Sequence, residues 1–197
     1  MNTFKLLFTF FVLLSSLNLF AVEFSATRHY GVVLINGKAF NSSTILKVGD
    51  TLQASGKKSF IQIKTDLGSV FLIRNGEMKL EKFNSEESSV NLISGKFFHF
   101  FNKKTHKRKF QVKTRHAIMG VRGTKYMIST SAKEDYLCVC SGKVSAKKND
   151  EKKEYIVGVN EDLFFYSSDK PSHKQSATKQ MVSMTSGEFD KMGFPVN

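Results

Sequence analysis

The chain has 197 residues, of which 41% are hydrophobic, and it carries a formal net charge of +13 at pH 7. This length is enough for one well-buried core and short for two, so we predict a single domain. Its two cysteines and scattered histidines lack the paired spacing of a metal site, which excludes a zinc module.

The first 21 residues have the pattern of a secretory signal peptide. Lys5 precedes an apolar run from Leu6 to Leu14, and a more polar stretch ends near Ala21. That run is shorter than the roughly 20 residues needed to cross a bilayer, and no later apolar segment is longer. We therefore expect cleavage after Ala21 and a periplasmic or secreted protein with no transmembrane span. An uncleaved anchor is the alternative, because Leu19 fits poorly three positions before the cut.

Export changes what the positive charge implies. In the cytoplasm it would favour nucleic acid, but the anionic surfaces outside are lipid headgroups, lipopolysaccharide and acidic wall polymers. We therefore expect no nucleic-acid partner. The basic cluster "NKKTHKRKF" contains no acidic residue, and it is interpreted either as a solvated loop or as a contact for an anionic surface. The candidate binding residues are Lys103, Lys104, Lys107, Arg108 and Lys109.

From Tyr30 onward the chain reads as short strands between turn residues. "YGVVLINGKAF" predicts two strands around Asn36-Gly37, a dipeptide that supplies the positive φ angles of a tight hairpin. "LKVGDTLQA" predicts a second turn at Gly49-Asp50. No helical pattern separates these strands, so an α/β arrangement is excluded.

The following segments continue the pattern. Residues 58–83 predict three short strands, separated at 66–69 and at Asn75-Gly76. "SVNLISGKFFHFF" predicts a further turn at Ser94-Gly95. "YLCVCSGKVSA" predicts another strand with a turn at Ser141-Gly142.

The stretch "FQVKTRHAIMGVRGTKYMIS", residues 110–129, alternates like a strand but has two glycines at its centre. No third glycine follows at dinucleotide-binding spacing, so a phosphate cradle is not expected. We interpret Gly120 and Gly123 as places where the strand bulges or a neighbour packs closely. Arg122 is predicted to point inward and bond carbonyls or a carboxylate. The alternative is a surface arginine that binds an anion.

The two cysteines, Cys138 and Cys140, are two residues apart in a predicted strand. They share a face at a separation beyond comfortable disulfide geometry. We interpret them as small buried side chains. A redox role of the pair is the alternative.

The chain ends in a polar segment and a short helix. Residues 167–180 are poor in apolar side chains and predict a surface loop or tail. Thr185 and Glu188 have the spacing of a capping box, which favours a helix that ends near Gly193. We predict an all-β fold, a two-sheet β-sandwich or short β-roll, with this short C-terminal helix. The expected units are a signal peptide (1–21), an all-β domain (22–166) and a linker with a tail (167–197).

The sequence offers no catalytic pattern. Phosphate-binding loops, a Gly-x-Ser-x-Gly elbow and a zinc-protease His-Glu pair are all missing. Acidic pairs lie beside lysines in polar loops, where they read as solvated. We therefore predict a protein that is not an enzyme and that has no cofactor and no metal.

Four motifs occur in order: "LKVGDTL" at 46–52, "TDLGSVFLIRNGEMKL" at 65–80, "GVRGTKYMI" at 120–128 and "SGKV" at 141–144. This succession resembles the FecR domain over residues 30–165. The resemblance implies an exported all-β module. The best-known members are inner-membrane regulators that relay a signal from an outer-membrane iron-siderophore receptor to a cytoplasmic sigma factor. The motif residues are Gly49, Asp50, Gly120, Arg122, Gly123 and Thr124.

The sequence departs from those regulators at both ends. It shows no cytoplasmic segment before the hydrophobic stretch and no second periplasmic domain, so we do not expect the iron-signalling role. We expect a non-catalytic binding or scaffold module that contacts an envelope protein or an anionic polymer. The alternatives are a cell-wall-acting enzyme or accessory protein, and a membrane-anchored periplasmic regulator of a signalling pathway.

Overall fold

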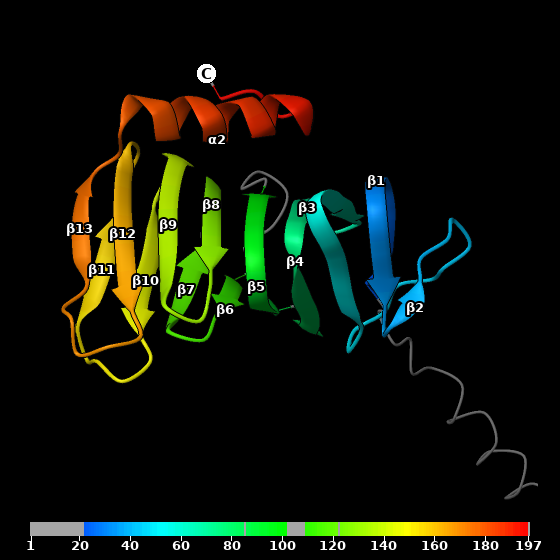
Figure 1. Cartoon of the computed structure of the whole chain (residues 1–197), viewed down its shortest axis with the longest axis horizontal. Coiled ribbons are helices and arrows are strands. Elements are labelled where there is room, and N and C mark those ends of the chain that lie inside the picture. The colour runs from blue at the N-terminus through cyan, green and yellow to red at the C-terminus, as the bar shows by residue number, and fades with distance from the viewer. Residues whose placement is uncertain (1–21, 85, 102–108, 122, 197) are drawn as a thin grey trace, which may run out of the picture.

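The structure is a computed structural model that describes residues 22–84, 86–101, 109–121 and 123–196. These residues form one open, 13-stranded mixed sheet and a C-terminal helix (Figure 1). The elements are β1 (Phe24–Ile35), β2 (Lys38–Ala39), β3 (Thr51–Thr65), β4 (Ser69–Phe83), β5 (Glu87–Phe101), β6 (Lys109–Lys113), β7 (Ala117–Val121), β8 (Lys125–Thr130), β9 (Glu134–Ser141), β10 (Val144–Lys148), β11 (Glu154–Val157), β12 (Glu161–Tyr166), β13 (His173–Ser176) and α2 (Lys179–Lys191).

The sheet divides in two at β5. The first half of β5 pairs in parallel with β6, and its second half pairs antiparallel with β8. One branch continues from β6 to β7, β10 and β11, and we call it the β6 layer. The other runs from β8 to β9, β12 and β13, and we call it the β8 layer. The predicted all-β fold with a C-terminal helix is confirmed, and its strands form one open mixed sheet with two branches.

The main core lies between the two layers. Met119 and Val144 of the β6 layer and Leu137 and Leu163 of the β8 layer are all completely buried there. Alternate residues of each strand point inward, as the period of two requires. Each such side chain contributes about 1.5–3 kcal/mol by leaving water, so this core carries most of the stability.

A second, smaller core lies beneath α2, on the outer face of the β8 layer. Phe189 of α2 is fully buried and contacts Phe98 with ring centroids 6.1 Å apart. The helix begins earlier than predicted because the Thr178 hydroxyl accepts a hydrogen bond from the Met181 amide and caps it. Thr185, predicted near its start, is instead buried in the middle of the helix.

Two predicted turns are wrong, because β4 and β5 run on through their glycines. The β4–β5 register shifts near Gly76, where the strands bulge instead of ending. A Cβ added to Gly76 would lie 2.0 Å from the Ser94 carbonyl oxygen, and Gly95 has φ of +90°. The glycines therefore let two backbones touch where β5 passes from one layer to the other.

The hairpin predicted at Asn36-Gly37 is confirmed. Both residues have positive φ, 51° and 76°, and Leu34 pairs with Ala39 across the turn. Asp50 holds this hairpin to the next turn. Its carboxylate accepts hydrogen bonds of 2.8 Å from the Asn36 side chain and from the Lys47 amide.

The stretch 110–129 is three strands rather than one bulged strand. β7 belongs to the β6 layer and β8 to the β8 layer, and Gly123, with φ of +67°, lies at the crossing between them. The chain crosses back between β9 and β10 at Gly142. A Cβ on Gly142 would lie 2.7 Å from the Gly123 carbonyl oxygen, so the two crossings pack against each other. The turn predicted at Ser141-Gly142 thus joins layers, not paired strands.

The polar segment 167–180 contains β13, which pairs with β12 at one edge of the sheet. Among the described residues, no helix is long and apolar enough to cross a membrane. The predicted signal peptide, residues 1–21, lies outside the described residues.

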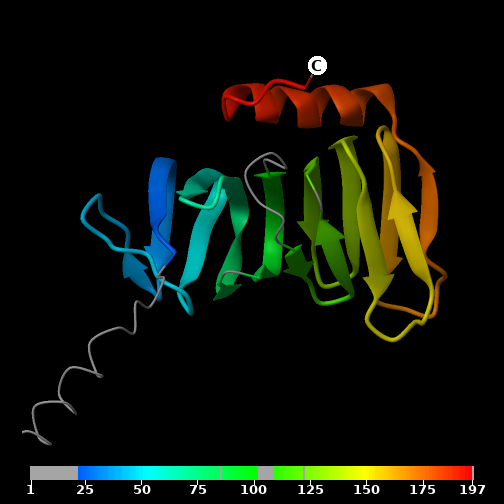
Figure 2. The same ribbon diagram turned by 180° about the vertical axis from the view of Figure 1, so that it is seen from behind.

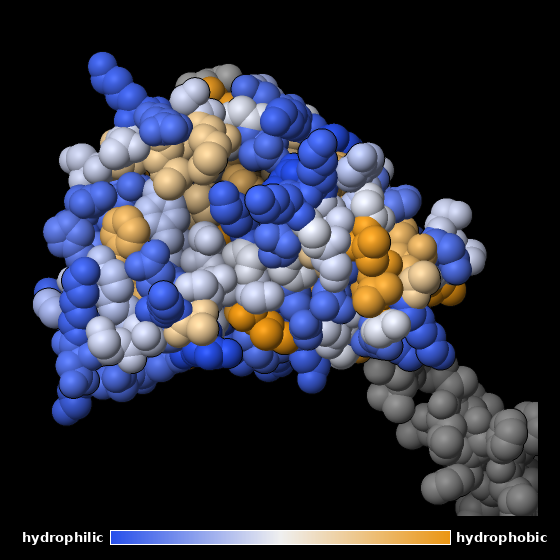
Figure 3. Space-filling model, viewed as in Figure 1, coloured by the Kyte–Doolittle hydropathy of each residue, from blue (hydrophilic) through white to orange (hydrophobic). Residues whose placement is uncertain are grey.

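Exposed apolar side chains gather at the opposite edge of the sheet. Figure 3 shows the orange surface near β1 and β2. Tyr30, Val32, Ile45 and Val48 are all exposed in this region.

Candidate functional site

Only part of the predicted basic cluster lies within the described residues. Lys109 is the first residue of β6 and is exposed to solvent. Outside the described residues lie Lys103, Lys104, Lys107, Arg108 and Arg122.

Lys109 belongs to a broader surface, the outer face of the β6 layer, which we call the basic face. Alternation along the four strands sends every second side chain outward, away from the main core. α2 packs on the outer face of the other layer, whereas no element that the structure describes lies over the basic face (Figures 1 and 2). The basic face consists of Lys109, Gln111, Lys113, Ile118, Gly120, Lys143, Ser145, Lys147, Glu154 and Ile156.

A shallow groove of about 340 Å³ runs across this face. Strand pairing aligns Gln111, Gly120, Ser145 and Ile156 in one row over four strands. The small side chains at Gly120 and Ser145 leave the row hollow. Lys109 and Lys143 also line the groove, so one residue of the predicted basic cluster and Gly120 of the glycine motif meet there.

Gly120 has a different role from the close approach we expected. A Cβ at this position would meet only the Ser145 carbonyl oxygen, at 3.9 Å, which is an ordinary contact. Its φ is not in the left-handed region. Neither packing nor backbone conformation requires glycine here, and its effect is to deepen the groove.

The lysines of the basic face differ in their pairing. Lys113 Nζ lies 2.7 Å from Glu81 Oε2, and Ser145 Oγ donates a hydrogen bond to Glu154. Lys109, Lys143 and Lys147 form no salt bridge with an acidic residue that the structure describes. These three ammonium groups remain available to an anionic partner.

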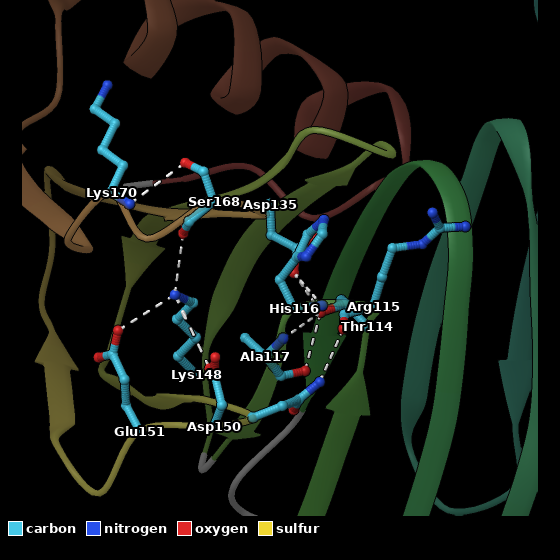
Figure 4. A network of polar contacts seen from close by, with 11 residues as sticks. Thr114, Arg115, His116, Ala117, Asp135, Lys148, Asp150, Glu151, Ser168 and Lys170 are labelled. Carbon is cyan, nitrogen blue, oxygen red and sulfur yellow. Dashed lines mark hydrogen bonds and ion pairs between the residues drawn. The ribbon is translucent and has the colours of Figure 1, made fainter.

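A buried carboxylate joins the two layers at the turn between β6 and β7 (Figure 4). Asp135 of β9 is completely buried and accepts hydrogen bonds from the hydroxyls of Thr114 and Thr130. It also accepts one from the His116 amide at 3.2 Å. Burial raises the pKa of Asp135, while the two threonine hydrogen bonds oppose that rise. The network ties the β6–β7 turn to the opposite layer, which makes it a structural element.

Next to this network, the side chain of Lys148 turns inward from β10. Its Nζ lies 3.5 Å from Glu151 Oε1 and donates a hydrogen bond of 3.4 Å to the Ser168 carbonyl (Figure 4). Lys148 is only 9% exposed, so its ammonium group is buried and is not part of the basic face.

A serine, a histidine and a tyrosine meet in the core without access to solvent. His99 Nε2 lies 2.7 Å from Ser69 Oγ, and its Nδ1 lies 2.7 Å from the Tyr126 hydroxyl. The Phe110 ring packs on the imidazole at 4.1 Å between centroids. None of these hydrogen-bonded groups is more than 2% exposed, and burial lowers the pKa of His99 to about 3. The geometry is that of a neutral, satisfied core histidine.

The buried histidine predicts a specific acid sensitivity. The unfolded chain takes up a proton near pH 6.5 and the folded His99 only near pH 3, so stability is lost as the pH falls through this window. Between pH 7 and pH 4, the wild type should lose about 3 kcal/mol more than His99→Gln in urea unfolding. The raised pKa of Asp135 acts in the opposite direction, but both proteins contain it, so it cancels in the difference. An identical pH dependence in the two proteins would contradict the buried neutral imidazole.

The interpretation of the two cysteines is confirmed. Cys138 and Cys140 are free thiols, and both are buried in the cluster beneath α2. Within the described residues, no group of three metal-ligating side chains comes together.

Comparison with known families fits this architecture. The family "FecR protein" matches residues 51–145, from the start of β3 to β10. The chain carries a FecR domain. This FecR domain includes both layer crossings and the centre of the basic face, whereas β1, β2, the last three strands and α2 lie outside the matched range. No curated protein matches the chain.

Two solved structures share the fold. Both are of a "putative anti-sigma factor" from Parabacteroides distasonis ATCC 8503, determined at 1.65 and 2.50 Å resolution. Each is 18% identical to this chain, with a TM-score of 0.58 over 68% of this chain and 62% of the other. The chain therefore spans less than two thirds of the length of the protein that it matches.

The sequence did not point to most of the basic face. Lys109 and Gly120 were singled out, but Lys143, Lys147 and Ile156 were not. Strand alternation could have placed Lys147 and Ile156 on an outward face, and Lys143 lies just before the same strand as Lys147. The face emerges only when β7 pairs with β10, a partner that is not next in the chain.

Proposed function

We propose that this protein is an exported, non-catalytic binding module whose FecR domain contacts an anionic component of the cell envelope through the basic face. Export is supported by the signal-peptide pattern of residues 1–21. The observation that carries the proposal is an exposed face on which Lys109 and Lys143 line a groove and Lys147 lies nearby, none of them in a salt bridge with a described acidic residue. Either an acidic polymer or an acidic protein surface would meet its charge.

The arrangement favours recognition of an extended anionic surface over chemistry. The described residues that line the groove are two lysines, a glutamine, two small residues and three apolar residues. Its one hydroxyl, on Ser145, donates a hydrogen bond to Glu154, and no histidine or cysteine lies among these lining residues. The serine, histidine and tyrosine that do meet are sealed in the core.

A regulator anchored in the membrane is the second candidate. It is supported by the shared fold with the Parabacteroides protein, which is described as a putative anti-sigma factor. The two candidates differ in the fate of the first 21 residues. N-terminal sequencing of the exported protein would give Val22 for a cleaved module and Met1 for an anchored regulator.

Removal of three lysines tests the proposal. The variant Lys109→Ser, Lys143→Ser, Lys147→Ser should bind poly-L-glutamate and short-chain polyphosphate about tenfold more weakly, because each exposed ion pair is worth up to about 1 kcal/mol. The same proteins should lose this binding as salt rises. Isothermal titration calorimetry at two salt concentrations measures both effects.

The matched control removes the same charge elsewhere. The variant Lys57→Ser, Lys58→Ser, Lys133→Ser changes three exposed lysines away from the basic face. It should bind the polyanions within about threefold of the wild type, since only the general charge has changed. Equal losses in the two variants would refute a specific role of the basic face.

A further inference from the structure

We infer that the basic face docks flat on an anionic phospholipid bilayer. This inference rests on the proposed function, because it names the anionic component that the face contacts. It differs in requiring apolar side chains as well as lysines at the contact.

Strand register fixes the layout of the lysines. Lys109 and Lys113 are the first and last residues of β6. Lys147 of β10 aligns with Lys113 through Ile118, and Lys143 immediately precedes β10. Four residues of strand span about 13 Å, and β10 lies two strands from β6, or about 10 Å away. The backbones of the four lysines therefore lie near the corners of a rectangle on one side of the molecule.

Two isoleucines stand between and beside these lysines. Ile118 is 43% exposed and Ile156 is 52% exposed, although both are large β-branched side chains in strands. Ile118 pairs directly with Lys113 on one side and Lys147 on the other. A solvated polyanion gains nothing from such residues. The interfacial zone of a bilayer accepts apolar side chains at the depth where lysines reach the headgroup phosphates.

The acidic residues near the face leave a net positive charge. Glu81 is engaged by Lys113, and Glu154 accepts the hydrogen bond from Ser145. Glu87, beside Lys109, forms a salt bridge with Lys82. Glu161, near Lys143, forms a salt bridge with Lys174. Lys109, Lys143 and Lys147 supply the remaining attraction, each worth about fivefold in affinity near an anionic membrane surface. Part of the outer face of the β8 layer is covered, because α2 packs there on Phe98, Met127 and Cys138.

The test is sedimentation of the purified exported protein with vesicles. We expect binding to phosphatidylethanolamine vesicles that contain about one third phosphatidylglycerol, and no binding to phosphatidylcholine vesicles. The double variant Ile118→Ser, Ile156→Ser should bind the anionic vesicles about tenfold more weakly. The single variant Ile118→Ser leaves the groove lining intact and should bind poly-L-glutamate as the wild type does. The control Val32→Ser, Ile45→Ser removes two exposed apolar side chains at the other edge of the sheet and should leave vesicle binding unchanged.

Filling the groove separates a flat contact from a ligand held inside it. Gly120→Val should leave vesicle binding within about twofold, because a bilayer rests on the face and does not enter the groove. Loss of vesicle binding in this variant would assign the ligand to the groove and overturn flat docking.

The outcomes distinguish this inference from the proposed function. Poly-L-glutamate binding without vesicle binding would overturn the lipid contact and leave the proposed function standing. Vesicle binding that survives loss of both isoleucines would also overturn it, since charge alone would then suffice. Absence of both kinds of binding would defeat the lipid contact and the proposed function together.

Discussion

Gly76→Ala should lower the free energy of unfolding by about 3 kcal/mol or more. The new Cβ would lie 2.0 Å from the Ser94 carbonyl oxygen and 2.6 Å from the Gly95 Cα. Both are backbone atoms of β5, so relief requires the two strands to separate where they bulge together. The lost stability comes from weakened pairing of β4 with β5, at the point where β5 passes from one layer to the other.

Gly120→Ala is the matched control, since it also places a methyl group on a glycine in a strand. Its Cβ would meet only one oxygen, at 3.9 Å, and the change should alter stability by less than about 1 kcal/mol. Urea unfolding followed by circular dichroism measures both variants. Similar losses in the two would show that the contact between the bulges does not determine the stability of the sheet.

The second large effect is expected at Asp135. Asp135→Ala should cost about 3 kcal/mol, because the Thr114 and Thr130 hydroxyls and the His116 amide would lose a buried acceptor. Asp135→Asn keeps the volume and one acceptor oxygen, so its loss should be intermediate.

Asp150→Ala provides the comparison for this effect. The Asp150 carboxylate lies 4.0 Å from Lys148 Nζ with its side chain 75% exposed, and its removal should cost less than about 0.5 kcal/mol. Thermal unfolding of the three variants at pH 7 ranks their losses of stability. A wild-type melting temperature for Asp135→Ala would contradict the assignment of this carboxylate as the link between layers.

Local turn chemistry could be read from the sequence where one backbone conformation admits few residues. Asn36-Gly37 forms the predicted hairpin because both positions need positive φ. The cysteines were placed correctly because strand alternation puts both on one face, beneath what proved to be α2.

Glycines whose role depends on a distant strand were misread. Gly76 and Gly95 look like turn residues within their own segments, but each is needed because the other lies against it across β4 and β5. Gly142 likewise depends on Gly123. A glycine marks a turn, a bulge or a close approach equally well, and only the pairing of strands decides among them.

The candidate site was predictable in part for the same reason. Lys109 stood out because it belongs to a run of cations, whereas Lys143 and Lys147 look ordinary in their short strand. The long-range pairing of β7 with β10 brings them onto one face, and no local pattern reports that pairing. The inward orientation predicted for Arg122 stays a prediction.

The most direct test of the account is to map where an anion binds. Titration of the isotopically labelled protein with short-chain polyphosphate, followed by amide NMR shifts, should perturb β6, β7, β10 and β11, with the largest changes near Gly120 and Ser145. The amides of Lys57 and Lys58, in an equally cationic part of β3, should stay unperturbed. Shifts concentrated at Lys57 and Lys58, or spread evenly over all exposed lysines, would contradict the basic face as the binding site of this FecR domain.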